Sequence, residues 1–251
     1  MGGGMLEVRE VTKAFGGFLA LNRVSLSVEQ GRFHALVGPN GAGKTTLFNV
    51  IVGRYRPDGG EVRLKGRRIH HLPTPRIVRM GVGVSFQRAQ AFLSMTAREN
   101  VMLALLGLRG GVYRGRPLSR FRREAERAEE LLGWVGLEKV ADRVAAELPL
   151  GDLKRLDIAM SLAGDPELLL LDEPLAGLSR AERRQMVDFI ERLLRRLKLT
   201  LLFTEHDTDA VLRLADRITV LHQGEVLAEG EPEAIKNDPR VVEAFLGGSH
   251  A

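Results

Sequence analysis

A glycine-rich segment with one lysine stands near the start of the chain. Residues 38–45 match the pattern G-x-x-x-x-G-K-[ST] at every fixed position. Glycines let backbone N–H groups turn towards phosphate oxygens, which a side chain would block. The pattern places the Lys44 cation at the β- and γ-phosphates and offers the Thr45 hydroxyl to Mg²⁺. The residues predicted to hold the nucleotide are Gly38, Pro39, Asn40, Gly41, Ala42, Gly43, Lys44, Thr45 and Thr46.

The sequence around this segment separates a functional motif from a chance glycine turn. The apolar run 33–37 predicts a strand directly before it, and residues 46–52 predict a helix directly after it. The N-terminus of that helix favours the same anion. A strand, a turn and a helix are the context that a phosphate-binding loop requires, and a chance turn requires none of it.

Two adjacent carboxylates, Asp172 and Glu173, follow the apolar run 168–171. In a phosphoryl-transfer site Asp172 would hold Mg²⁺ through water, and Glu173 would activate the attacking water. The alternative is an exposed acidic turn after a strand, which is common in α/β proteins. The phosphate-binding pattern earlier in the chain favours the catalytic interpretation, with ATP and Mg²⁺ as cofactors.

The elements that must position these motifs predict an α/β fold. Continuous apolar runs predict buried strands at 33–37, 168–171 and 201–204. Helical patterns alternate with them at 180–196 and 207–215. Alternating runs predict half-buried antiparallel strands at 6–11 and 24–28, and residues 61–64 predict another short strand after a turn.

The segment from about residue 92 to 155 is helical in pattern and includes no convincing strand. We therefore predict a P-loop NTPase core with an antiparallel β subdomain and an inserted helical subdomain at 91–155. The whole is one domain over 5–251, with a C-terminal helical tail at 229–247.

Composition limits the class of protein. The 251 residues are 44% hydrophobic and 27% charged, as in a globular chain with a real core. The lack of cysteine excludes disulfides and cysteine-based metal sites. The longest apolar run, 101–106, is far short of the ~20 residues that span a bilayer, and residues 1–5 lack a signal-peptide layout. We predict a soluble protein whose link to a membrane comes through a partner.

The net charge of +5 raises nucleic acid as a possible ligand. Many of the arginines lie between residues 109 and 127, and from 121 to 132 they interleave with glutamates at helical spacings. That spacing indicates a solvated, salt-bridged helix face. Aromatic residues that would stack on bases are nearly absent there. We predict no nucleic-acid partner.

The order and spacing of the motifs resemble the ABC ATPase family over nearly the full length of the chain. Gln87 follows the strand pattern 82–86, His206 follows 201–204, and Phe15 lies upstream of the phosphate loop. Alone, these residues would be taken as a surface amide, a helix-capping imidazole and a core ring. The resemblance implies that Phe15 stacks on adenine, that Gln87 senses Mg²⁺ and couples to the membrane domain, and that His206 hydrogen-bonds the γ-phosphate.

The resemblance also assigns the candidate site residues by role. The catalytic candidates are Glu173, His206, Gln87 and Lys44. The metal candidates are Thr45, Gln87 and Asp172.

The segment 148–152 departs from the L-S-G-G-Q that is usual in this family, where the loop reaches across a dimer to the partner's γ-phosphate. Pro149 has neither the serine hydroxyl nor an N–H, and we expect Leu150 to resist the φ that glycine allows. Gly151 is retained, and the resemblance implies that it contacts nucleotide. Ser179 stands where the family frequently has aspartate. These departures leave open a module that holds ATP without hydrolysing it.

Segments 86–101 and 229–247 resemble the ATPases of importers for branched-chain amino acids and related amides. The resemblance implies a subunit that binds and hydrolyses ATP at the cytoplasmic face of a prokaryotic membrane. Its partners would be permease subunits, a second and non-identical ATPase, and indirectly an extracytoplasmic binding protein. Urea importers and lipopolysaccharide exporters share much of the pattern. A non-transport ABC ATPase that acts on nucleic acid or the ribosome is another alternative, although such proteins usually carry a coiled coil or two cassettes.

Overall fold

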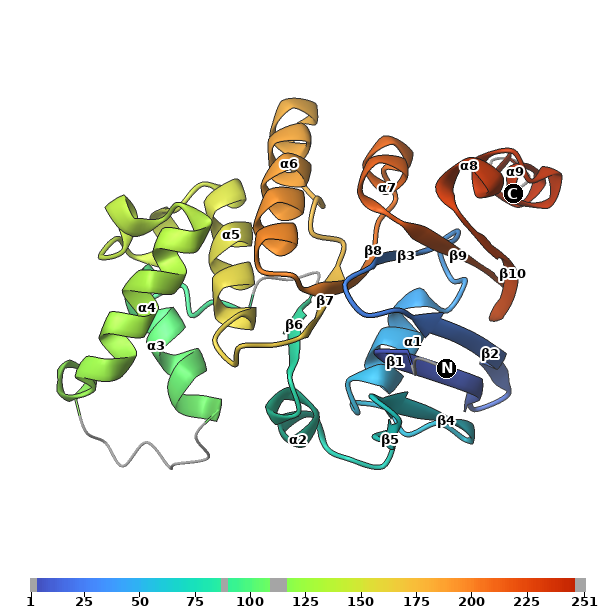
Figure 1. The fold of residues 1–251 in the computed structure, drawn as a ribbon, viewed down its shortest axis with the longest axis horizontal. Helices are drawn as coiled ribbons and strands as arrows, with labels where there is room; N and C mark the ends of the chain where they lie inside the picture. Colours follow the sequence, from blue (N-terminus) through green and yellow to red (C-terminus); the bar gives the residue numbers. More distant parts are fainter. Residues whose placement is uncertain (1–3, 87–89, 109–116, 247–251) are drawn as a thin grey trace.

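The computed structural model describes residues 4–86, 90–108 and 117–246 (Figure 1). Their strands form two sheets. The first has the order β2-β1-β4-β5, from β1 (Leu6–Phe15), β2 (Phe18–Val28), β4 (Gly59–Leu64) and β5 (Arg67–Arg68). The second has the order β10-β9-β3-β8-β7-β6, from β3 (Phe33–Val37), β6 (Val82–Ser85), β7 (Leu168–Asp172), β8 (Thr200–Thr204), β9 (Arg217–His222) and β10 (Glu225–Gly230).

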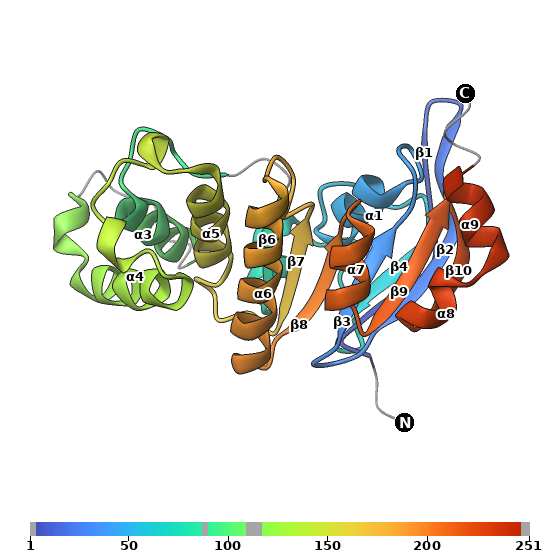
Figure 2. The same cartoon turned by 90° about the horizontal axis from the view of Figure 1, so that it is seen from above.

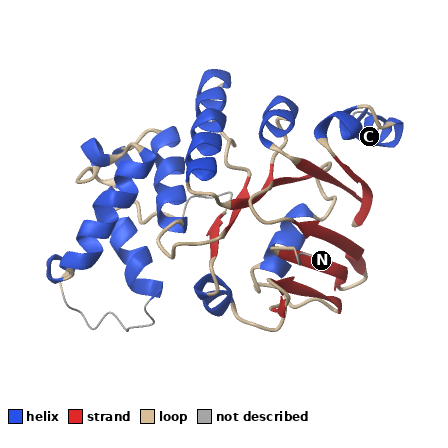
Figure 3. Ribbon diagram, viewed as in Figure 1, coloured by secondary structure: helices blue, strands red, loops and turns tan. Residues whose placement is uncertain are grey.

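Figure 3 shows the helices in blue. They are α1 (Lys44–Ile51), α2 (Thr74–Arg79), α3 (Ala97–Leu108), α4 (Arg122–Val135), α5 (Leu150–Ser161), α6 (Arg180–Arg196), α7 (Thr208–Leu214), α8 (Pro232–Lys236) and α9 (Pro239–Leu246). Short 3₁₀ turns lie at Leu118–Arg120, Glu138–Val140 and Ala145–Glu147. Helices α3, α4 and α5 gather at one end of the molecule, away from the antiparallel sheet (Figures 1 and 2).

The second sheet is parallel except for its edge strand β10, which is antiparallel to β9. Its central strands are buried on both faces, so they appear in the sequence as continuous apolar runs. In β7, Leu169 and Leu171 join the core shared with the helical segment, whereas Leu168 and Leu170 join the core around α1 and the antiparallel sheet. The sheet therefore joins the two halves of the molecule, and its strand ends are fixed from both sides.

The antiparallel sheet differs from its prediction in length. Strands β1 and β2 run through residues that the alternating pattern did not include, and shifts in register interrupt their pairing between Val8 and Ala14. Glu10, beside one of these shifts, has φ of 47°. An irregular pairing breaks the period of two, which explains why the alternating pattern did not continue beyond residue 11 in β1.

The arginine-rich face of α4 is only partly the solvated surface that its sequence predicts. Arg127 pairs with Glu130 at 2.5 Å and also with Asp165, as expected of a salt-bridged helix. Glu124, however, is 4% exposed and lies among the buried residues of α4. The prediction of a fully solvated face is wrong at this position.

One boundary of the predicted insertion and one boundary of the predicted tail fall inside a helix or a strand. Residue 155, at the end of the predicted insertion, lies within α5. Residues 229 and 230, at the start of the predicted tail, end strand β10, and the helices α8 and α9 follow. Among the described helices, none combines the length and the apolar composition that crossing a membrane requires.

His34 gives the fold a measurable dependence on pH. It lies buried in β3, and its Nε2 is 2.7 Å from Thr219 Oγ1. Burial lowers the pKa of His34 from 6.5 to about 4, with the Glu229 carboxylate opposing this shift. Between those two pH values the unfolded chain binds more protons than the folded one, so the free energy of unfolding falls as the pH falls from 6.5 towards 4. At about 1.36 kcal/mol per pKa unit, the loss approaches about 3 kcal/mol.

Urea unfolding measured from pH 7.5 to pH 4.5 checks this expectation. A His34→Gln variant, which cannot take up the proton, should show a shallower fall over that range. If the free energy of unfolding falls equally with pH in the two proteins, His34 has the same pKa in the folded and the unfolded chain.

Candidate functional site

The phosphate loop, residues 38–43, joins the end of β3 to the start of α1. Its glycines are required by close backbone approaches. A Cβ at Gly38 (φ 155°) would stand 2.2 Å from the carbonyl oxygen of Leu221, and a Cβ at Gly43 (φ 105°) would stand 2.7 Å from that of Ala20. Both approaches exclude any larger residue, so strands β9 and β2 fix the shape of the loop.

Lys44 begins α1, and its ammonium group lies inside the loop. Its Nζ donates to the carbonyl oxygens of Gly38, at 2.7 Å, and Pro39, at 3.0 Å. Burial lowers the pKa of Lys44, while the carboxylates of Glu173 and Asp172 act in the opposite direction. The cation and the two predicted carboxylates therefore share one site.

Asp172 and Glu173 lie where β7 ends, next to the end of β8. Thr204 Oγ1 donates to Asp172 Oδ1 at 2.6 Å and accepts from the Glu173 amide at 3.1 Å. Burial raises the pKa of Asp172, although the Thr204 hydrogen bond lowers it. Glu173 has φ of 49°, a left-handed conformation that is uncommon for a residue with a side chain. The neighbouring carboxylates of Asp172 and Glu173 therefore reach different partners, Thr204 and His206.

His206 pairs with the predicted base. Its Nε2 is 2.8 Å from Glu173 Oε1, and the pair joins the segment after β7 to the segment after β8. The His206 side chain is 45% exposed and that of Glu173 is 16% exposed. At this distance the imidazole and the carboxylate form a direct hydrogen bond, so each side chain orients the other at the site.

Glu205 was missed by sequence reasoning, although it is next to His206. It is buried, and its carboxylate accepts from the amides of Leu175, at 2.7 Å, and His206, at 3.2 Å. Burial raises the pKa of Glu205, and the two amides oppose this. The carboxylate ties the loop after Glu173 to the loop that carries His206.

Lys154 of α5 was also missed. It is buried, and its Nζ lies 3.4 Å from the Glu173 carbonyl oxygen. Burial lowers the pKa of Lys154. Its partners are distant in sequence, so no local pattern in the chain signals this role.

The altered signature segment forms the start of α5. Pro149 is the N-cap residue, and Leu150 is the first helical residue. Neither Leu150 nor Gly151 is among the described residues with positive φ, so Leu150 has an ordinary helical conformation, in line with the expectation that it resists the φ open to glycine. Leu150 is 42% exposed, and its Cδ2 would be 2.9 Å from a Cβ at Gly177. The segment therefore lies against the loop that follows Glu173.

Phe15 and Gln87 complete the predicted set. Phe15 ends β1, is 43% exposed and contacts Tyr55 edge to face, with the ring centroids 5.2 Å apart. Gln87 lies outside the described residues. The buried Asp157 of α5 accepts from the Ser85 hydroxyl and, at 3.0 Å, from the Gln90 amide, which are described residues on either side of 87–89 in the sequence.

The donor set fits a magnesium nucleotide. The glycine cradle with Lys44 suits a polyphosphate, and the exposed Thr45 lies beside it. Mg²⁺ usually takes one or two carboxylates together with substrate phosphates and water, and Asp172 supplies a carboxylate of that kind. No group of three or more acidic or histidine residues within the described ranges forms a preassembled metal cage, and Mg²⁺ with nucleotide requires none.

Comparison with known proteins gives the family. The sequence profile described as "ABC transporter" matches residues 21–176. The chain belongs to the ABC transporter family. A second profile, "Branched-chain amino acid ATP-binding cassette transporter", matches residues 225–251. The predicted P-loop NTPase core of an ABC ATPase, with its antiparallel sheet and helical insertion, is confirmed.

Individual relatives extend over the whole length of this ABC protein. It is 41% identical to the high-affinity branched-chain amino acid transport ATP-binding protein LivG of Salmonella typhimurium, over 97% of this chain and 98% of that protein. The BraF protein of Pseudomonas aeruginosa, with the same description, is 41% identical over the same shares. A nucleotide-free ATP-binding cassette of an ABC transporter superposes with a TM-score of 0.86 at 31% identity, covering 96% of this chain and 98% of that one.

Helix α6, which follows the loop after Glu173, begins after Ser179, the residue that stands where the family often has aspartate. Ser179 is the N-cap of α6: its Oγ accepts from the Glu182 amide, and the Glu182 carboxylate accepts from the Ser179 amide at 2.8 Å. Ser179→Ala removes one of the two bonds of this capping box. We expect it to lower the free energy of unfolding by about 1 kcal/mol.

Chemical denaturation measures that loss. Ser179→Asp, which keeps an N-cap acceptor, should stay close to the parent protein. If Ser179→Ala unfolds at the parent midpoint, the capping box adds nothing to stability.

Proposed function

We propose that this ABC protein binds ATP with Mg²⁺ between its phosphate loop and the segments after β7 and β8, and that hydrolysis there drives import of branched-chain amino acids or related small metabolites. The observation that carries the ATPase assignment is the convergence of Lys44, Asp172 and the Glu173–His206 pair on one site. The match of the tail to the branched-chain amino acid profile supports the substrate class.

Each side chain has a defined task in this proposal. Lys44 and the loop amides bind the β- and γ-phosphates, and the exposed ring of Phe15 stacks on adenine. Glu173 accepts the proton of the attacking water, and His206 orients the γ-phosphate. Thr204 and Glu205 hold these two groups at their loops.

The metal would be held by Thr45, Asp172 and Gln87. When bound, Mg²⁺ neutralises charge on the phosphate oxygens and orients them for in-line attack. Asp172 is prepared for this by Thr204, which fixes one carboxylate oxygen and leaves the other free to receive the metal or a metal-bound water.

The proposal extends to domains and partners. Residues 5–251 would act as one ATPase domain with a helical subdomain at 91–155 and a tail at 229–247. It would work at the cytoplasmic face of a prokaryotic membrane, with permease subunits, a second and non-identical ATPase, and indirectly an extracytoplasmic binding protein. The ion pairs of Arg127 with Glu130 and Asp165 argue against the alternative of a nucleic-acid partner, because they neutralise part of the basic cluster.

Lys44→Ala tests the nucleotide site. The variant removes the cation that the loop directs at the phosphates, and we expect the affinity for ATP to fall by at least about tenfold. Titration calorimetry with Mg²⁺ and ATP measures this affinity. Lys65→Ala, which removes an exposed ion pair with Glu167, serves as the control. An unchanged affinity in Lys44→Ala would refute this site.

A further inference from the structure

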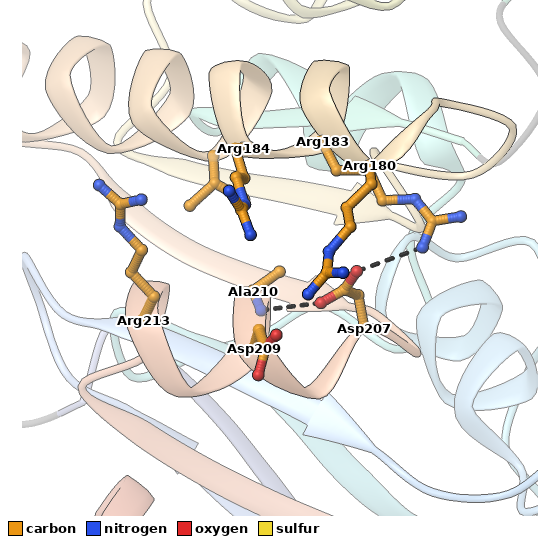
Figure 4. A pocket seen from close by; sticks show the side chains of 8 residues that line it. Arg180, Arg183, Arg184, Asp207, Asp209, Ala210 and Arg213 are labelled. Carbon is orange, nitrogen blue, oxygen red and sulfur yellow. Dashed lines mark hydrogen bonds and ion pairs between the residues drawn. The ribbon is translucent and has the colours of Figure 1, made fainter.

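A small basic cavity lies between helices α6 and α7, outside the nucleotide site. Its volume is about 140 Å³, and both helices line it (Figure 4). The charged residues of the lining are Arg180, Arg183, Arg184, Asp207, Asp209 and Arg213. Four guanidinium groups face two carboxylates, so the lining carries two more positive than negative charges.

This charge is poorly compensated within the protein. Arg183 pairs with Asp207 at 3.2 Å, and Arg213 pairs with Asp188 at 2.5 Å. Among the described residues, Arg180 and Arg184 form no ion pair. Figure 4 draws the side chains of both beside the cavity. Both also lie in the first turns of α6, where a cation is opposed by the helix dipole. An anion that enters the cavity would therefore meet two guanidinium groups that are not already engaged in ion pairs with the described residues.

Arginine rather than lysine supplies the charge, and this points to the geometry of the ligand. A guanidinium group donates two parallel hydrogen bonds to phosphate or carboxylate oxygens. The cavity is smaller than the ~300–1,000 Å³ sites of drug-sized ligands, so it suits a group of the size of phosphate or pyrophosphate. We propose that this cavity is an anion site for a phosphate group, carried by a small metabolite and held by Arg180, Arg184 and Arg213.

The site is connected to the catalytic loops through Arg183. Its Nε donates to the Leu178 carbonyl oxygen at 2.9 Å, and its guanidinium group reaches Asp207, the residue after His206. Asp207 also caps α7 by accepting from the Ala210 amide at 3.0 Å. A phosphate group beside Arg183 competes with Asp207 for the Arg183 guanidinium group. Occupancy of the cavity therefore changes the link between the loop after Glu173 and the loop that carries His206. The inference does not depend on what the subunit transports.

The test uses inorganic pyrophosphate on the Lys44→Ala variant, in which the nucleotide site is disabled. Calorimetry at fixed ionic strength should detect binding, and adding Arg180→Gln with Arg184→Gln should weaken it by at least about tenfold. The matched control adds Arg192→Gln with Arg196→Gln, which removes the same charge from the same helix outside the cavity and should leave the affinity unchanged. Hydrogen exchange at residues 175–178 and 206–210 should change when pyrophosphate saturates the protein.

Three results would overturn the proposal. The first is no binding to Lys44→Ala, and the second is an equal loss in both double variants, which indicates unspecific attraction to basic charge. The third is tighter binding of poly-glutamate than of pyrophosphate, which would assign the cavity to an acidic protein segment. Exchange that stays unchanged on binding would refute the connection to the catalytic loops.

Discussion

Glu173→Gln should reduce the turnover of ATP by about 10²–10⁴-fold while leaving ATP binding intact. The amide keeps the size of the side chain and a hydrogen bond to His206, but it cannot accept the proton of the attacking water. The defect should therefore appear in kcat and in kcat/KM, with little change in the affinity measured by titration. Steady-state hydrolysis by the assembled transporter and titration with Mg²⁺ and ATP together measure both quantities.

The control is Glu126→Gln, an exposed glutamate of α4 that lies far from the loops of Glu173 and His206 in sequence. It should hydrolyse ATP at the parent rate. Parent-like hydrolysis by Glu173→Gln would show that another group is the base.

The second large effect concerns the partner subunit. Alone, this protein should hydrolyse ATP slowly, and a second ATPase with an intact signature segment should raise the rate by about 10²–10³-fold for each restored donor to the transition-state charge. The chain has all four residues proposed for the nucleotide site, Lys44, Asp172, Glu173 and His206. In its signature segment, by contrast, Pro149 offers neither a hydroxyl nor an N–H. A dimer of this chain alone would repeat that deficiency in both of its sites.

Pro149→Ser gives a direct check on the same protein. Pro149 is an N-cap residue with φ of −55° and ψ of 153°, a backbone conformation that serine adopts and in which serine is a favoured cap. The substitution should therefore leave α5 stable and raise the rate of the chain alone. Brisk, cooperative hydrolysis by the unmodified chain as a homodimer would contradict the asymmetric assembly.

The sequence predicted those parts of the site that adjacent residues define. The phosphate loop and the Asp172–Glu173 pair can be recognised because each is a short segment at the end of a buried strand, and the strand pattern is visible beside it. His206 and Gln87 needed the resemblance to a family, since a single histidine or glutamine has no spacing of its own.

The parts that the sequence did not predict depend on contacts between distant segments. Glu205 binds an amide thirty residues away, and Lys154 reaches a carbonyl nineteen residues away. Neither partnership leaves a period or a motif in the chain. The start of α5 at Leu150 also lacks a signal of its own in the chain, because it depends on the extended conformation of the Pro149 cap.

Glu173 links stability to activity. A residue with a side chain in the left-handed region is less favourable by roughly 1–2 kcal/mol than in its preferred conformation, and glycine avoids most of that strain. Selection for heat resistance alone would therefore tend to replace Glu173 with glycine, and under the proposed mechanism the resulting subunit would be more stable but inactive. A library of this protein screened for folding should lose Glu173 early, whereas a library screened for growth on the transported nutrient should retain it.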